Sequence, residues 1–327
     1  MVMAMGMRTR LVAMTVICLV TAGSKVQGAE WPARSVKFIV PSPPGGSIDV
    51  TARLYGERLA AQWNHPVTVE NRPGADGILA VQALMGAKDG HTLLLGFPGL
   101  VTVVPLLHER LPYNPDRDLE PITSVAKDFL AIAVTNALSA KSLSELVALA
   151  RGKSQDLNWA ASPGAPYLTF LEFRKRAGLT LTAVPYRSGA SALPDLVSGQ
   201  VHIGVLPLAS ALPQARSGKL RLLAVTAADR VAAAPDIPTA AESGYPELTV
   251  EAPLGLFAPA GTPGPLKERI ASDVRLIAAT EEVAARLFSL GMVARGSTPS
   301  EYTRTLHEQR ARWTEFAKNH NLLSIGK

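Results

Sequence analysis

The chain has 327 residues, with 33 lysines and arginines against 27 acidic residues, six histidines and one cysteine. Because that cysteine, Cys18, is near the N-terminus, the remaining chain has no disulfide framework, thiolate nucleophile or cysteine metal site. A chain of this length can bury enough surface to fold without cross-links. No run of basic residues is interleaved with aromatics, so the charge argues against a nucleic-acid partner and favours small anionic ligands at most.

Residues 1–28 have the pattern of a secretory signal peptide. Arg8 and Arg10 precede an apolar run at 11–20, and small residues end at Gly28, so we expect cleavage before Ala29. The apolar run is about half as long as a membrane-spanning helix. Removal of residues 1–28 leaves a chain with 30 basic and 27 acidic residues, a net charge of +3.

A lipid anchor on Cys18 is the alternative interpretation of this segment. Residues 15–17, Thr-Val-Ile, lack the small residue that such processing needs before the cysteine. We therefore expect an exported protein without this anchor.

After residue 29, short apolar segments alternate with amphipathic ones, which is typical of an α/β fold with parallel strands. The first series has strands at 36–40, 67–70 and 92–96 and helices at 48–63 and 78–85. The polar, proline-rich run 111–121 is interpreted as a surface connection. Its Asp116 and Asp118 could form a metal pair, but solvated turn carboxylates are the better interpretation.

The second series has strands at 131–135, 157–161, 182–184, 201–206 and 220–226, separated by helices. One helix begins with a capping box, Ser142 with Glu145, and ends at Gly152. A stretch rich in proline and small residues, 228–259, is interpreted as the return crossing between domains.

Three C-terminal helices follow this crossing. The first begins at Thr262-Pro263, the second spans the apolar positions 283–290, and the third begins with the capping box Thr298 and Glu301. We expect the aromatic residues of the third helix to pack against the first domain.

The sequence offers only weak evidence for catalysis. It contains no G-x-S-x-G, H-E-x-x-H, Walker A or G-x-G-x-x-G motif, and its histidines lie in separate elements without ligand spacing. No acid and base pair is favoured over another. We expect no catalytic residue, metal or cofactor.

The stretch 38–54, FIVPSPPGGSIDVTARL, combines a strand, a glycine turn and a helix start with Asp49 in its first turn. The N–H groups of Gly45, Gly46 and Ser47 can face a ligand at the positive end of the helix dipole, a place suited to a carboxylate. An ordinary tight connection without a ligand is the alternative.

Three further loops follow strands at the edge where open α/β sheets bind ligands, at 96–99, 162–165 and 186–190. Each alone could be a plain turn. Their repetition predicts a site in a cleft between two domains.

The chain resembles the Bug family, the periplasmic solute-binding proteins of tripartite tricarboxylate transporters, over essentially the whole mature sequence. The matching runs are WPARSVKFIVPSPPGGSIDVTARL, TVENRPGADG, DGHTLLLG, LPYNPDRDLEPI, VPYRSGASALPDLVSGQV, LPQARSGKLRLLAVT, DIPTAAESGYP and LFAPAGTP.

This resemblance implies a type II-like, two-domain periplasmic binding protein, each domain a mostly parallel sheet flanked by helices. Two crossovers would join residues 29–126 plus 252–327 to residues 127–251. A small carboxylate-bearing solute would lie between the domains, held mainly by backbone amides and ordered waters. We therefore expect these ligand-binding residues: Ser42, Pro43, Gly45, Gly46, Ser47, Asp49, Phe97, Pro98, Gly99, Ser162, Gly164, Tyr167, Tyr186, Arg187, Ser188, Gly189, Ala190 and Leu206.

The chain departs from the family pattern near this cleft. Ser42 replaces a usual aromatic, Phe97-Pro98 a Thr/Ser-rich loop, Tyr167 a common histidine, Leu206 a frequent aspartate and Pro253 a frequent tryptophan, and the loop at 162–166 is shorter. We therefore expect a ligand less polar than citrate or aspartate, with an apolar or aromatic portion near Phe97, Tyr167 and Leu206. A protein that has lost tight binding is the alternative.

The resemblance implies a monomeric periplasmic protein that delivers a small organic acid to the permease subunits of such a transporter. Two alternatives stay open: a protein that signals to a membrane sensor, and an exported α/β enzyme acting on a small acid.

Overall fold

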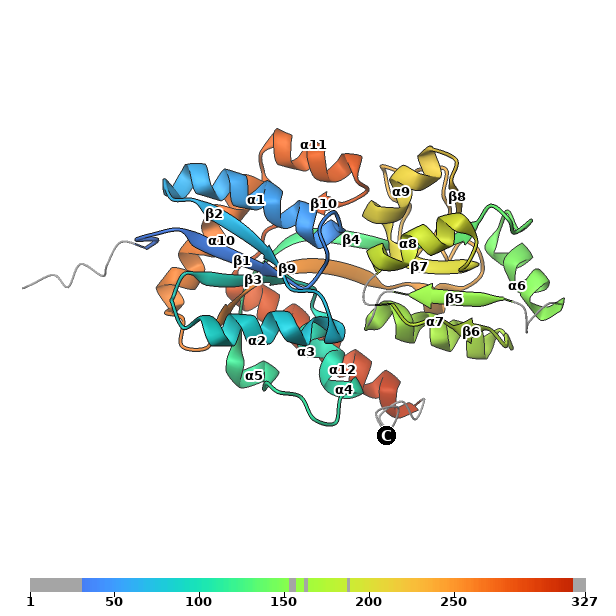
Figure 1. The fold of residues 1–327 in the computed structure, drawn as a ribbon, viewed down its shortest axis with the longest axis horizontal. Coiled ribbons are helices and arrows are strands. Elements are labelled where there is room, and N and C mark those ends of the chain that lie inside the picture. Colours follow the sequence, from blue (N-terminus) through green and yellow to red (C-terminus); the bar gives the residue numbers. More distant parts are fainter. Residues whose placement is uncertain (1–30, 153–156, 162–163, 187–188, 320–327) are drawn as a thin grey trace, which may run out of the picture. The chain divides into compact units, whose positions relative to one another are not determined.

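The computed structural model describes residues 31–152, 157–161, 164–186 and 189–319. The expected signal peptide at 1–28, with Cys18, lies outside these residues. Within Trp31–Lys327, strands and helices alternate as expected, and we describe them as two lobes joined by shared strands (Figure 1).

Lobe 1 is built on β1 (Val36–Val40), β2 (Val67–Asn71), β3 (Thr92–Gly96) and the short β10 (Val293–Ala294). Its helices are α1 (Ser47–Trp63), η1 (Ala75–Gly77), α2 (Ile78–Ala87), α3 (Gly99–Thr102), α4 (Val104–Leu107), α5 (Pro115–Asp118), α10 (Gly264–Ala278), α11 (Glu281–Ser289) and α12 (Pro299–Asn319).

Lobe 2 is built on β5 (Asn158–Ala161), β6 (Thr182–Ala183), β7 (Ile203–Pro207) and β8 (Leu220–Val225). Its helices are α6 (Leu143–Gly152), α7 (Ala165–Arg176), α8 (Gly189–Ser198), α9 (Leu208–Arg216) and η2 (Pro246–Leu248). Two longer strands, β4 (Leu119–Thr135) and β9 (Glu251–Pro259), carry the chain between the lobes.

The strands form one sheet in the order β2-β1-β3-β9-β4-β7-β5-β6, with β8 and β10 also paired to β4. β1 pairs in parallel with β2 and β3, and β5 with β6 and β7. β4 changes partners along its length: it pairs antiparallel with β9 as far as Phe129, and with β7 and β8 from Leu130 onward. β4 therefore passes from one lobe to the other at this point.

Each lobe has helices on both faces of its part of the sheet, because adjacent strand residues point to opposite sides. Phe38 and Val40 join one buried cluster with α1 and α10, whereas Ile39 joins another with α2 and α12. In β4, Leu130 and Ile132 face α6 and α7, and Ala131 faces α8 and α9 (Figure 1). The strands are therefore buried on both sides, as the expected α/β architecture requires.

Two expectations about the strands are corrected. The connection expected at 111–121 ends earlier, because β4 begins at Leu119, and the return crossing expected at 228–259 contains β9. Prolines and small residues in both strands interrupt the apolar alternation by which strands are predicted. The predicted domain boundaries at 126/127 and 251/252 fall inside β4 and at the start of β9, and they stay a prediction.

The last helix begins as expected and packs against both lobes. Thr298 accepts a hydrogen bond from the N–H of Glu301 (3.2 Å), and the Glu301 carboxylate accepts one from Thr298 (2.8 Å), which confirms the capping box. Tyr302 lies in the lobe 1 cluster with Phe257, but Trp313 lies in the cluster with Trp159 of lobe 2. Because the second cluster also contains Val103 of lobe 1, the aromatics of α12 pack against the first domain as expected, and Trp313 lies near side chains of lobe 2 as well.

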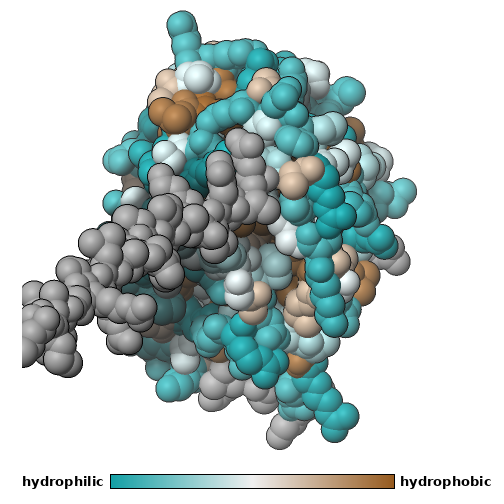
Figure 2. All heavy atoms as spheres, turned by 90° about the vertical axis from the view of Figure 1, so that its left-hand side faces the viewer, coloured by the Kyte–Doolittle hydropathy of each residue, from teal (hydrophilic) through white to brown (hydrophobic). Residues whose placement is uncertain are grey.

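The face shown in Figure 2 is mostly hydrophilic, with a small group of hydrophobic residues near its upper edge. The large hydrophobic side chains exposed on the described residues are Leu79, Leu276, Phe288 and Val293. In the same part of the chain, no helix combines the length and the apolar character that crossing a bilayer needs.

Gly255 of β9 gives a test of this packing. A Cβ at Gly255 would lie 1.9 Å from the hydroxyl oxygen of Tyr302, which is 1% exposed. We expect Gly255→Ala to lower the free energy of unfolding by about 1–3 kcal/mol through overpacking. Gly86→Ala, where a Cβ in α2 meets nothing within 4 Å, should instead raise it by about 0.5–1 kcal/mol. Urea unfolding of both variants checks this, and equal effects would contradict it.

Candidate functional site

A cavity of about 120 Å³ lies between the two lobes, close in size to the ~150 Å³ engineered cavity that takes benzene. Apolar side chains make up much of its wall. The residues that line it are Pro41, Ser42, Gly46, Ser47, Ile48, Asp76, Gly77, Phe97, Pro98, Gly99, Thr102, Asp128, Leu130, Ala165, Pro166, Gly189, Pro207, Ser210, Val250, Pro253, Leu254, Gln309 and Trp313.

Four helices of nine residues or more begin at this cavity: α1, α7, α8 and α9. Ser47, Ala165 and Gly189 are the first residues of α1, α7 and α8, and Ser210 lies in the first turn of α9; all four line the cavity. The first N–H groups of a helix have no acceptor within the helix, and the dipole makes that end positive. Helix ends from both lobes therefore make the cavity wall favourable for a negatively charged ligand.

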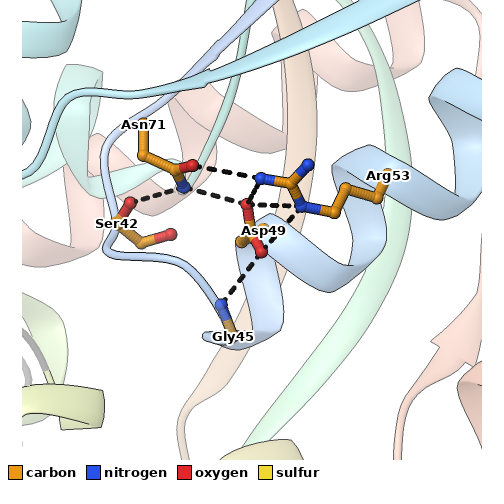
Figure 3. A network of polar contacts seen from close by, with 5 residues as sticks. All are labelled: Ser42, Gly45, Asp49, Arg53 and Asn71. Carbon is orange, nitrogen blue, oxygen red and sulfur yellow. Dashed lines mark hydrogen bonds and ion pairs between the residues drawn. The ribbon is translucent and has the colours of Figure 1, made fainter.

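The glycine turn before α1 is held by an ionic network that engages Gly45. The N–H of Gly45 donates to a carboxylate oxygen of Asp49 (2.9 Å), which also accepts from Arg53 (3.1 Å). The side-chain amide of Asn71 donates to Asp49 and to the Ser42 carbonyl, both at 2.9 Å (Figure 3). This network fixes the turn and so the position of the α1 terminus.

Asp49 is therefore a structural residue. Burial acts to raise its pKa, but hydrogen bonds from Arg53, Gly45 and Asn71 outweigh this effect and lower the pKa below its usual value. Because its oxygens are engaged and Gly45 uses its N–H, neither residue lines the cavity, and neither does Pro43. Direct ligand binding by these three residues stays a prediction.

Two buried hydroxyl groups on the cavity wall lack partners. The hydroxyl oxygens of Ser42 and Ser210 have no hydrogen-bond partner among the described residues. Ser42 is only 6% exposed, and its hydroxyl stands apart from the network in Figure 3. Because a buried hydroxyl without a partner costs about 1–3 kcal/mol, these groups are suited to a polar ligand.

Asp128 places a carboxylate on the same wall. It is 2% exposed, and its carboxylate accepts from the N–H of Phe129 at 2.8 Å. Burial raises the pKa of Asp128 to about 7, and hydrogen bonds from the Ser47 hydroxyl and the N–H groups of Phe129 and Ala209 only partly oppose this. The side chain thus joins the starts of α1 and α9 at the point where β4 changes lobes.

The other strand-end loops contribute in part. Phe97, Pro98, Gly99 and Gly189 line the cavity together with Ser42, Gly46 and Ser47, as expected. Ser162, Arg187 and Ser188 lie outside the described residues, as does the side chain of Ala190.

Four expected residues face elsewhere. Tyr167 stacks on Trp159 with ring centroids 5.0 Å apart, and the Tyr186 hydroxyl donates to Asp195. Leu206 is fully buried in the core of lobe 2, because its neighbour Pro207 takes the cavity side. Gly164 precedes α7 with a positive φ of 86° and does not line the cavity.

The sequence-based prediction missed other lining residues, among them Asp128, Ser210, Gln309 and Trp313. Only Asp128 carried a signal, as a lone acid in the apolar run VAKDFLAIAV. Asp76 also lines the cavity and pairs with His108 at 2.8 Å. Among the described residues, no cluster of three or more His, Cys, Asp or Glu could hold a metal.

The two acids considered as a metal pair are bound to arginines. Asp116 pairs with Arg310 at 2.6 Å and Asp118 with Arg117 at 2.8 Å. These ion pairs agree with the interpretation of the two acids as turn carboxylates.

Known proteins resemble the chain over most of its length. A family model described as "Tripartite tricarboxylate transporter family receptor" matches residues 51–322. Protein BugT of Bordetella pertussis is 36% identical over 261 residues, which cover 78% of this chain and 80% of that protein.

Solved structures agree with this match. MatC from Rhodopseudomonas palustris with bound malate is 31% identical, with a TM-score of 0.81 and coverage of 87% of this chain and 99% of that one. An R. palustris protein with adipate is 30% identical, with a TM-score of 0.85 and coverage of 88% and 97%.

The fold, with a cavity between two α/β lobes, is that of a periplasmic binding protein, a class of solute-binding proteins rather than enzymes. The chain belongs to the tripartite tricarboxylate transporter receptor family, and its similarity to BugT confirms the resemblance to the Bug family.

The raised pKa of Asp128 predicts a pH dependence of stability. Between its ordinary pKa of 3.8 and its folded pKa of about 7, the folded protein holds a proton that the unfolded chain has lost. The free energy of unfolding therefore falls as pH rises across this window. Asp128→Asn removes this effect, so its stability relative to the wild type should rise by roughly 3 kcal/mol from pH 5 to pH 8.

Urea unfolding at both pH values checks this expectation. The exposed Asp236→Asn serves as the control, and its stability relative to the wild type should change little between the two conditions. A pH-independent difference for Asp128→Asn would contradict it.

Proposed function

We propose that this protein is exported to the periplasm, captures a small carboxylate-bearing solute between its lobes and delivers it to the permease of a tripartite tricarboxylate-type transporter. It binds without catalysing a reaction. The observation that carries the proposal is the cavity at which four helix starts from both lobes meet beside the Ser42 hydroxyl, which has no hydrogen-bond partner among the described residues.

The cavity chemistry supports a carboxylate with an apolar body. Helix N-termini stabilise an anion through their N–H groups and dipoles. Phe97, Leu130, Leu254 and Trp313 supply apolar surface for the rest of the molecule. The related structures with adipate and malate support the same ligand class. Delivery to a permease is supported by the family description.

We keep the proposal that an apolar part of the ligand lies near Phe97, but we no longer place it near Tyr167 or Leu206. Leu206 is buried in the core of lobe 2 and Tyr167 stacks on Trp159, whereas Trp313 of α12 lines the cavity. We therefore place the apolar part of the solute between Phe97 and Trp313.

A thermal-shift and calorimetric panel tests this function. We expect at least one C4–C8 carboxylate to bind at micromolar concentrations and to raise the melting temperature, because a ligand selective for the folded state stabilises it by mass action. The corresponding alcohols, which lack a carboxylate, are the control. Equal stabilisation by the alcohols, product formation on prolonged incubation, or no binding at all would contradict the proposal.

Ser42→Ala gives a sharper test. Removing a buried hydroxyl without a partner should leave the stability of the ligand-free protein unchanged or raised by up to about 1 kcal/mol. Affinity for the bound acid should fall about five- to tenfold, because the ligand loses one hydrogen bond. Ser217→Ala, on an exposed turn after α9, is the control for both measurements. Lower stability with unchanged affinity would assign Ser42 a structural role instead.

A further inference from the structure

Asp128 is one of two acidic residues, with Asp76, in a cavity whose helix starts attract anions. Its carboxylate already accepts from the Ser47 hydroxyl and the N–H groups of Phe129 and Ala209. A carboxylate offers about four acceptor positions, so one position stays available to a molecule in the cavity. The negative charge of ionised Asp128 thus offsets part of the positive potential at the N-termini of α1 and α9.

No charged side chain of the described residues neutralises it directly. None of the groups that shift its pKa is charged. On α1, Asp49 and Arg53 pair with each other, and Asp76 pairs with His108 across the cavity wall.

Two further cations lie near the same elements. Arg216, in the last turn of α9, donates to the carbonyls of Ser289 and Ala233. Lys127 follows the alternation of β4 to the opposite side, and its nitrogen lies 5.5 Å from the centre of the Phe129 ring. When it is ionised, Asp128 therefore presents its charge to the cavity.

The position of Asp128 is fixed by the fold. In β4 it lies opposite Ala252 of β9, one residue before the strand changes partners at Phe129 and Leu130. This pairing with β9 fixes the backbone of Asp128, and its side chain lines the cavity. A ligand that fills the cavity must therefore accommodate this carboxylate.

We propose that Asp128 determines the charge selectivity of the cavity. It disfavours a solute with two carboxylates and favours one with a single carboxylate and a second polar group that donates a hydrogen bond, such as a hydroxyl, amide or ammonium group. This inference rests on the proposed carboxylate binding. Like charges placed side by side in a site of low dielectric constant repel strongly, whereas a donor gains a charge-assisted hydrogen bond.

The test compares each dicarboxylate with its own monoamide, which has almost the same shape but one charge fewer. Succinate is paired with succinamate and adipate with adipamate in calorimetric titrations at pH 8.5, where Asp128 is ionised. We expect the wild-type protein to bind at least one monoamide about tenfold or more tightly than the matched diacid. In Asp128→Asn the ratio should fall to within about threefold, because the amide removes the charge and keeps the shape.

Each outcome decides a different point. A wild-type preference for the diacid, or an unchanged ratio in Asp128→Asn, would overturn the selectivity role, even if the variant lost stability. The wild-type ratio needs no variant, so it tests the inference even if Asp128→Asn fails to fold. Absence of binding by every acid to both proteins would contradict the proposed function itself. Asp236→Asn, which removes an exposed charge, should keep the wild-type ratio.

Discussion

The continuous pairing of β4 is the constraint on which both lobes depend. One strand of 17 residues supplies an antiparallel partner to β9 in lobe 1 and to β7 and β8 in lobe 2. It has a strand partner along almost its whole length, and a buried backbone group without a partner is costly. The side chains where the partners change are therefore held in place, and one of them is Asp128 at the cavity.

The cavity combines two opposing electrostatic features. The helix starts attract a negative group, whereas Asp128 resists a second one. Between them lie apolar side chains and two hydroxyls that have no hydrogen-bond partner among the described residues. Affinity for the solute class thus comes from backbone geometry that many sequences can supply, and discrimination within the class comes from a few side chains.

The local pattern of the sequence predicted the strand, turn and helix of 36–63 well, because apolar periodicity and glycine turns are local signals. It missed most of β4 and β9, in which Pro121, Pro253 and Gly255 interrupt the pattern, and register shifts at Pro121/Thr123 and Ser124/Ala126 break the alternation. The site shows the same limit. Gly46 and Ser47 were found from the helix start, but the inward direction of Pro207 rather than Leu206 depends on strand register, which pairing in space determines.

Helix α12 has a mechanical consequence. The whole helix has 21 residues and is about 30 Å long. Tyr302, near its start, packs in a cluster of lobe 1, and Trp313, eleven residues later, lies in a cluster that also contains side chains of lobe 2. Hinges made only of paired strands can both bend and twist, but a stiff helix bound at both ends resists twisting. We expect the lobes to open along a single bending direction. Because Trp313 both lines the cavity and packs in this cluster, entry of the solute and loosening of the helix contacts would involve the same side chain.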